Sequence, residues 1–231
     1  MTITIGSAAI DAVYAAGGIQ AEAVYLGTTL VWQATKQSYS YTFSGTTKPP
    51  EIIDVALNSG AGIPTTVSGG VIREPNSATS NNTYYTAAIW GVQMGTNYYS
   101  SSVKNGNLNA TNRYIGAGMS NADGSVVVFC RVPAQAGYAA NIMTAIGGVI
   151  TSQASQNVSV GSSQVIDLIP TISGGVYTYT LYVNGASKFS WTDSSGVIGA
   201  PGKYPCGIFG HIYSSGQYGS PGISAYATAD I

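Results

Sequence analysis

Tyrosines that flank polar loops are the residues in this sequence best suited to contact a ligand. The loops are rich in serine, threonine and asparagine, as in the segments 80–83 and 214–217. An aromatic ring offers apolar area, and neighbouring amides and hydroxyls offer directional hydrogen bonds, so such loops suit a neutral sugar. The same rings suit a protein partner, or they simply cover the edges of sheets. The candidate sugar or partner contacts are Tyr84, Tyr85, Tyr98, Tyr99, Tyr213 and Tyr218.

Residue types that commonly catalyse reactions are scarce and isolated. His211 is the single histidine, and no G-x-S-x-G motif lies near it. The interior carboxylates form no recognisable pair for glycoside hydrolysis. Asn121 and Asp123 fit a calcium loop, but Asn-x-Asp-Gly is also a good turn, which we favour. One histidine and two distant cysteines cannot form a zinc site. The sequence therefore predicts no enzyme, no bound metal and no cofactor.

The charge content excludes several classes of protein. Only 7% of residues are charged, the formal net charge is −1, and 45% are hydrophobic. A disordered chain would have few apolar residues and a high net charge. A nucleic-acid-binding protein would need a basic stripe, which eight scattered cations cannot make. Such a low charge favours a subunit that is permanently covered in an assembly over a freely diffusing enzyme.

Neither export nor membrane insertion is indicated. The N-terminus shows no secretory signal. No apolar run approaches the roughly 18 residues that span a membrane. Cys130 and Cys206 lie far apart and match no metal spacing. Without an export signal, two buried thiols are favoured over a disulfide.

Short strands separated by turn residues dominate the chain from residue 38 onward. Residues 125–132 are β-branched or aromatic almost throughout. Residues 176–183 and 188–191 flank Asn184-Gly185, a strong hairpin signal. Only a segment near 137–146 could also form a helix. These patterns predict an all-β fold, an antiparallel two-sheet β-sandwich of the jelly-roll type. The further strands are expected at 38–43, 52–57, 84–93, 113–119, 164–169, 207–213 and 223–229.

The first 36 residues contain a short repeat. Ala12-Val13-Tyr14 recurs as Ala23-Val24-Tyr25, and each copy is followed by a glycine-containing turn. The second copy predicts a hairpin that continues into Leu30-Val31-Trp32. Residues 8–17 fit a strand or a helix, and the repeat favours strands. So short a segment cannot bury a core alone. We therefore expect a docking module over 1–36 and a sandwich over 37–231, with Tyr14, Tyr25 and Trp32 as candidate docking residues.

Two stretches resemble known protein families. The segment 23–32 resembles the opening module of virion proteins from tailed phages of actinobacteria, which repeat an apolar-Tyr-x-Gly-x-x-x-Val-Trp pattern. The stretches 176–185, 191–197 and 207–210 are similar to the last third of a concanavalin A-like (laminin-G-like) sandwich found in phage minor tail proteins. The middle of the chain resembles these proteins only in its general pattern and shares no specific motif with them.

The resemblance implies a structural protein of a phage virion, most simply a minor tail subunit at the tail tip or a fibre. Its location would be the virion, assembled in the host cytoplasm. The implied partners are other virion proteins, further copies of the chain (a trimer being one option) and a glycan of the host cell wall. Nucleic acid is not among them. The alternatives are a carbohydrate-binding module without catalysis and a capsid decoration protein.

Overall fold

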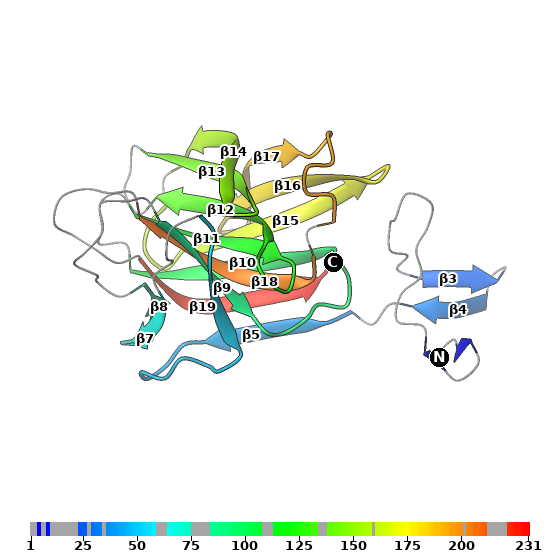
Figure 1. Cartoon of the computed structure of the whole chain (residues 1–231), viewed down its shortest axis with the longest axis horizontal. Helices are drawn as coiled ribbons and strands as arrows, with labels where there is room; N and C mark the ends of the chain where they lie inside the picture. The colour runs from blue at the N-terminus through cyan, green and yellow to red at the C-terminus, as the bar shows by residue number, and fades with distance from the viewer. Residues whose placement is uncertain are drawn as a thin grey trace.

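Every regular element of the described chain is a β-strand (Figure 1). The computed structural model describes residues 4–5, 8–9, 23–26, 29–33, 36–58, 64–74, 84–107, 113–133, 138–158, 160–200, 202–211 and 221–231. These residues include no helix that could cross a membrane. The predicted all-β class is confirmed. The segment near 137–146, for which a helix was an alternative, contains a strand over Ala139–Ile146.

Two antiparallel sheets pack face to face and form the sandwich. The first, sheet I, has the strand order β17–β16–β15–β10–β19–β8–β7, and β5 also pairs with β19. Its strands are β5 (Ser38–Thr42), β7 (Thr66–Ser68), β8 (Val71–Arg73), β10 (Tyr99–Asn107), β15 (Val165–Ser173), β16 (Val176–Val183), β17 (Ala186–Thr192) and β19 (Gly222–Asp230).

The second, sheet II, has the order β14–β13–β12–β11–β18–β9–β6. Half of its pairs join strands that are distant in sequence, so this sheet is assembled from segments spread over residues 52–211. Its strands are β6 (Ile52–Ala56), β9 (Tyr84–Trp90), β11 (Arg113–Ser120), β12 (Val126–Pro133), β13 (Ala139–Ile146), β14 (Val149–Asn157) and β18 (Tyr204–His211).

Large apolar and aromatic side chains fill the space between the sheets. Trp90 of sheet II stacks on Tyr226 of sheet I, with ring centroids 5.4 Å apart. Tyr179 and Phe209 are fully buried in the same core. This contact between the inner faces explains the alternation along β16, where every second residue is buried.

The predicted hairpin at Asn184-Gly185 is confirmed. It joins β16 to β17, and both residues have positive φ, 50° at Asn184 and 73° at Gly185. This is the backbone conformation that a two-residue turn of the primed type requires, and asparagine and glycine adopt it at low cost. Local chemistry therefore decides this connection.

The N-terminal segment contains two short ribbons. The strand β1 (Thr4–Ile5) pairs with β2 (Ala8–Ala9). The predicted hairpin is confirmed as β3 (Ala23–Leu26) and β4 (Thr29–Gln33), which pair with each other. Residues 10–22 lie outside the described part, so the question of strand or helix is answered only for β2. The division at residue 36 and the docking role remain predictions.

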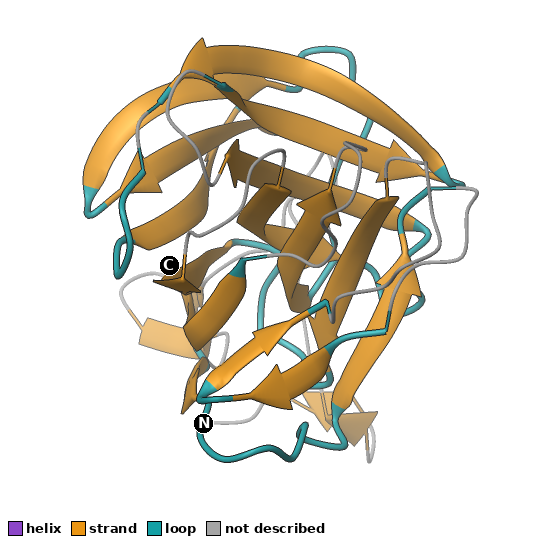
Figure 2. Cartoon of the chain, turned by 90° about the vertical axis from the view of Figure 1, so that its left-hand side faces the viewer, coloured by secondary structure: helices purple, strands orange, loops and turns teal. Residues whose placement is uncertain are grey.

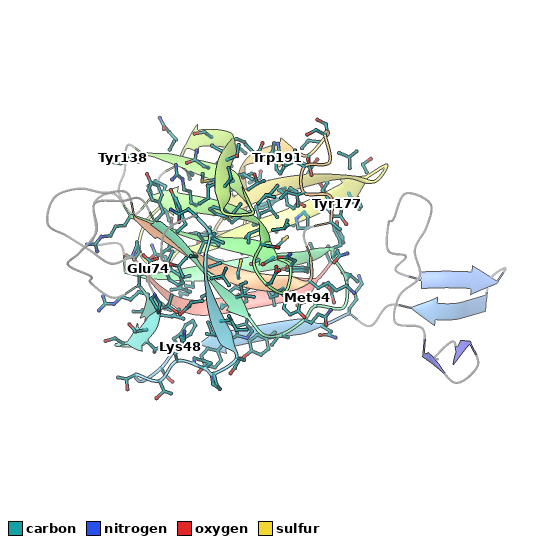
Figure 3. All side chains as sticks on the ribbon, in the orientation of Figure 1. Lys48, Glu74, Met94, Tyr138, Tyr177 and Trp191 are labelled. Atoms are coloured by element: carbon teal, nitrogen blue, oxygen red, sulfur yellow. The ribbon has the colours of Figure 1, made fainter. Side chains whose placement is uncertain are left out.

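The strands of sheet II run from one end of the sandwich to the other. We call these ends the Tyr138 end and the Met94 end, after a residue at each. The Tyr138 end holds the first residues of β9, β11 and β13, and the Met94 end holds the last residues of β9 and β11 (Figure 3). At the Met94 end the carboxylate of Asp230 accepts hydrogen bonds from the backbone N–H groups of Gln37, Gly95 and Thr96. These bonds tie the start of the sandwich to its last strand.

Candidate functional site

The tyrosines singled out from the sequence lie at both ends of the sandwich. Tyr85 is a buried residue of β9 at the Tyr138 end. Tyr99 is fully buried in the core near Ser120, at the Met94 end, and Tyr98 beside it is half-buried. The side chains of Tyr84, Tyr213 and Tyr218 lie outside the described part, as do Tyr14 and the side chains of Tyr25 and Trp32. Among the described residues, the structure therefore brings no two of these rings together.

A row of polar and aromatic residues crosses sheet II near the Tyr138 end, which faces the viewer in Figure 2. Arg131 of β12 lies opposite Asn141 of β13. On the other side, Tyr114 of β11 lies opposite Gly210 of β18, which lies opposite Tyr85 of β9. Side chains alternate along a strand. Because Cys130 points into the main core, Arg131 points to the outer face, turned away from sheet I.

The guanidinium of Arg131 lies over two tyrosine rings. Its carbon Cζ is 4.4 Å from the ring centroid of Tyr114 and 5.5 Å from that of Tyr85. Gly210 separates these tyrosines in the sheet and has no side chain. Each such cation–π contact contributes roughly 0.5–2 kcal/mol. The guanidinium therefore packs against both tyrosines.

Hydrogen bonds fix the orientation of Arg131 from its other side. Its Nε donates to Oδ1 of Asn141 over 2.9 Å, and Nδ2 of Asn141 donates to Oγ of Ser152 in β14 over 3.1 Å. The two terminal nitrogens have no hydrogen bond to a described residue and are not among the fully buried unpartnered atoms. They therefore remain free to donate to a ligand.

Among the described residues, Arg131 is a desolvated cation without a counter-ion. Its side chain is half-buried, and this burial lowers its pKa from 12.5 to about 10. No carboxylate counteracts the shift, and the described residues give Arg131 no ion pair. At neutral pH the guanidinium stays charged. The site thus presents a positive charge in a poorly solvated setting.

The pairing between β11 and β12 is interrupted beside Arg131. Residues pair regularly on both sides of the gap, but Gly116 and Ala117 have no assigned partner in β12. A Cβ on Gly116 would lie 1.7 Å from the carbonyl oxygen of Cys130. Only glycine permits so close an approach of the two backbones. The register is the same on both sides of the gap, so neither strand carries an inserted residue there.

A second apolar cluster covers the rest of the outer face of sheet II. It approaches the Met94 end, where Gly124 of the turn after β11 lies against Val55 and Ile89. The row around Arg131 therefore borders a packed, apolar floor. The buried members of the cluster are Leu57, Tyr85, Ala87, Ile89, Val127, Phe129, Met143, Ala145, Cys206 and Ile208.

The ring of Tyr138 and the hydroxyl of Tyr85 also lie around the site. Tyr138, just before β13, is 40% exposed. It lies near Tyr114, whose pKa is raised first by burial and then by Tyr138. The hydroxyl of Tyr85 is buried and has no hydrogen-bond partner among the described residues. An exposed ring and an unused hydroxyl thus accompany the guanidinium.

Sequence reasoning missed Arg131, Tyr114, Tyr138 and Asn141 as site residues. One signal was available: Arg131 is the single charged residue in the strand Val126–Pro133, which is otherwise apolar. A lone charge in a buried strand needs a partner or a function. The contacts with Tyr114 and Asn141 could not be foreseen, because they depend on the order of strands in the sheet.

The other residues with possible chemistry have structural partners. Asn121 and Asp123 form the favoured turn, in which they accept hydrogen bonds from the backbone N–H groups of Val126 and Ser125. Asp193 accepts three backbone N–H groups from residues 197–199. Among the described residues, no group of three histidine, cysteine or acidic side chains could hold a metal ion. His211 pairs through its backbone with β9 and β11.

Both cysteines are free, buried thiols. Cys130 belongs to the core between the sheets, whereas Cys206 belongs to the cluster on the outer face of sheet II. Burial raises the pKa of Cys130 to about 12. Since the two side chains point to opposite faces of one sheet, the favoured prediction of two thiols is confirmed.

Comparisons with known proteins identify the fold. No protein-family model matches the sequence, and no curated protein is similar to it. A β-agarase A in complex with oligoagarose has a TM-score of 0.56 and 8% identity, over 85% of this chain and 93% of that chain. A Crh5 transglycosylase has a TM-score of 0.53 and 11% identity, over 84% of each chain. Lectin II from Ulex europaeus has a TM-score of 0.50 and 10% identity, over 84% and 99%.

The fold is a jelly-roll sandwich of the concanavalin A-like kind, as the sequence resemblance implied. At such low identity the likeness concerns the fold alone. Nothing in the comparisons identifies a phage tail protein or an actinobacterial origin. That part of the resemblance stays a proposal.

The prediction that the protein is not an enzyme is wrong, because it excluded catalysis altogether. An agarase and a transglycosylase have the same sandwich, so this fold supports catalysis in those proteins. The prediction was based on the absence of short catalytic motifs. In a sandwich, however, residues distant in sequence meet on one face, as Tyr85 and Arg131 do here. An active site on such a face leaves no short motif.

Proposed function

We propose that the protein is a carbohydrate-binding domain whose ligand lies on the outer face of sheet II at the Tyr138 end. The observation that carries the proposal is the grouping of Arg131, Tyr114, Tyr138, Asn141 and Ser152 within one row and its margin. The exposed ring of Tyr138 suits the apolar face of a sugar, and the terminal nitrogens of Arg131 and the hydroxyl of Ser152 suit its hydroxyls. Tyr114 and Asn141 are buried and hold Arg131 in place.

The surroundings support this proposal over a purely structural role for the row. The buried apolar cluster packs beside the row, and the hydrogen bonds through Asn141 hold Arg131 in place before a ligand binds. The lectin and the agarase complex that share the fold make a carbohydrate ligand a natural choice. Tyr138, with 40% of its surface exposed, is the ring best placed for stacking.

The finer proposal is a minor tail subunit of a phage virion that contacts a host glycan. It is supported by the sequence resemblance of segment 23–32, and the hairpin of β3 and β4 provides strands for docking. Deletion of residues 1–36 should leave a soluble sandwich that no longer enters particles. Unchanged incorporation of the shortened chain into purified virions would contradict the docking role.

A glycan array with the full chain tests the carbohydrate proposal directly. We expect binding above background, and Tyr138→Ala should weaken it about tenfold, equivalent to about 1.4 kcal/mol. Tyr182→Ala is the matched control, because Tyr182 is a half-buried tyrosine on the outer face of sheet I. A folded protein that binds no glycan, or equal losses in the two variants, would contradict the proposal.

A further inference from the structure

We propose that Arg131 selects an anionic glycan by binding a carboxylate or phosphate group of the ligand. The inference rests on the proposed function and adds the chemical class of the ligand. Its basis is the contrast between the charge of Arg131 and its lack of a counter-ion among the described residues. A ligand that supplied the missing negative charge would complete the site.

Several other buried or half-buried charges of the described chain have partners of their own. Lys48 pairs with Asp54 over 2.6 Å. Lys203 donates to the carbonyl of Gly95, and Asp193 accepts backbone N–H groups. Arg131 has only the neutral oxygen of Asn141 among the described residues. Desolvation of an unpaired charge is costly, and the lowered pKa of Arg131 reflects that cost.

The remaining donors of Arg131 match an anion in geometry. Because Nε donates to Asn141 and Cζ packs against Tyr114, the guanidinium is held at two points and its terminal nitrogens form a pair of donors. A planar pair of N–H donors fits two oxygens of a carboxylate or phosphate. A neutral sugar hydroxyl would use one donor at a time and would leave the charge uncompensated.

A structural role alone does not explain an arginine at this position. A methionine or leucine would cover the rings of Tyr114 and Tyr85 without the cost of burying a charge, and replacing buried charges by apolar residues is often neutral or stabilising. The hydrogen bonds through Asn141 to Ser152 would also be unnecessary for covering. Both features are explained if the guanidinium must be held in a fixed orientation toward a ligand.

The experiment compares an acidic ligand with its uncharged ester and with a second source of negative charge. Isothermal titration of the full chain would use an oligogalacturonide, its fully methyl-esterified form, and a poly(glycerol phosphate). The first two distinguish a carboxylate from the same sugar without charge, and the third tests a phosphate source. We expect the acid, the phosphate polymer or both to bind at least tenfold more tightly than the ester, with a preference that decreases as salt is raised.

Variants assign the preference to Arg131. Arg131→Met should remove it while leaving the affinity for the ester within about threefold, a change of under 1 kcal/mol. Arg131→Lys keeps the charge without the planar pair and should retain part of the preference. Lys104→Met is the control, because it removes one exposed charge from β10 of sheet I. If Arg131→Met does not fold, Asn141→Ala, which releases Nε, should weaken binding of the acid more than that of the ester.

Two results would overturn the inference. One is equal affinity for charged and uncharged ligands in the wild type, and the other is a preference that survives in Arg131→Met. If the array shows binding of neutral glycans while the charged probes show no advantage, only this inference fails. If neither the array nor the titrations detect any glycan, the proposed function fails with it.

Discussion

The outer faces of the two sheets differ in how they meet solvent. Along β16 of sheet I, buried and half-buried residues alternate, so the inner face is packed and the outer face reaches water. Along β11 of sheet II, seven consecutive residues are buried. The middle of sheet II is therefore buried on both faces, whereas its edge strand β14 is not, and the apolar cluster around Phe129 and Ile208 is a second core.

This difference explains where a ligand site can form. A charged residue on the solvated face of sheet I is screened by water, whereas a residue at the margin of the second core is partly stripped of water. Arg131 lies at that margin, and its pKa is lowered. Electrostatic contacts with a ligand are stronger in such a setting, so the outer face of sheet II is the better place for recognition.

The largest effect should come from the close approach of β11 and β12 in sheet II. Gly116→Ala would place a Cβ against the carbonyl oxygen of Cys130. We expect a loss on the order of 3 kcal/mol in the free energy of unfolding, or no folded protein. Gly161→Ala, where the nearest atom to a new Cβ is 3.8 Å away, is the control. Equal urea midpoints for the two variants would contradict the proposed close contact.

A pair of isoleucines tests the second core itself. Ile208 is fully buried on the outer face of sheet II, and Ile169 is partly exposed on the outer face of sheet I. Ile208→Ala should cost about 3 kcal/mol and Ile169→Ala about 1 kcal/mol, because only the first leaves a cavity. Chemical denaturation measures both. If the two losses were the same, the faces would not differ as described.

The smallest effect concerns the acids and the dependence of stability on pH. Burial raises the pKa of Asp167 on sheet I, against the opposing hydrogen bond from Ser102. Protonation of this group therefore favours the folded state, and its contribution to stability decreases as pH rises from the ordinary aspartate range through the raised value. Asp167→Asn should flatten that decrease in a series of Tm measurements.

Asp123 provides the opposite sign. Hydrogen bonds from Ser125 lower the pKa of this exposed carboxyl. Its contribution is present above the unfolded pKa and is lost as pH falls through the folded value. Asp123→Asn should therefore lower Tm at neutral pH and have less effect in acid. Identical pH profiles for the two variants would show that burial at Asp167 has no influence.

Parts of the fold could be predicted because their causes are local. The alternation in β16 and the turn at Asn184-Gly185 lie within single short segments. The strands β10 and β14 were missed for two reasons. In β10 the buried positions include the polar residues Ser101 and Asn105, and in β14, at the edge of sheet II, all positions are exposed or half-exposed. Neither strand shows hydrophobic periodicity.

The site was less accessible to sequence reasoning than the fold. The sequence pointed to aromatic rings near polar loops, and Tyr85 does border the site. Tyr99 has the same type of neighbours in sequence but lies in the core. Tyrosine suits both settings, since its ring packs well and its hydroxyl tolerates a polar margin. Composition alone cannot separate them.

The sequence by itself determined that this chain forms strands, turns and a two-sheet sandwich, because alternation and turn chemistry act over a few residues. Only the tertiary structure decided that Arg131, Tyr114 and Asn141 meet on one face, because their proximity depends on strand order and register. It also decided that Arg131 has no acid beside it among the described residues. A missing neighbour is a property of the assembled surface and not of any segment.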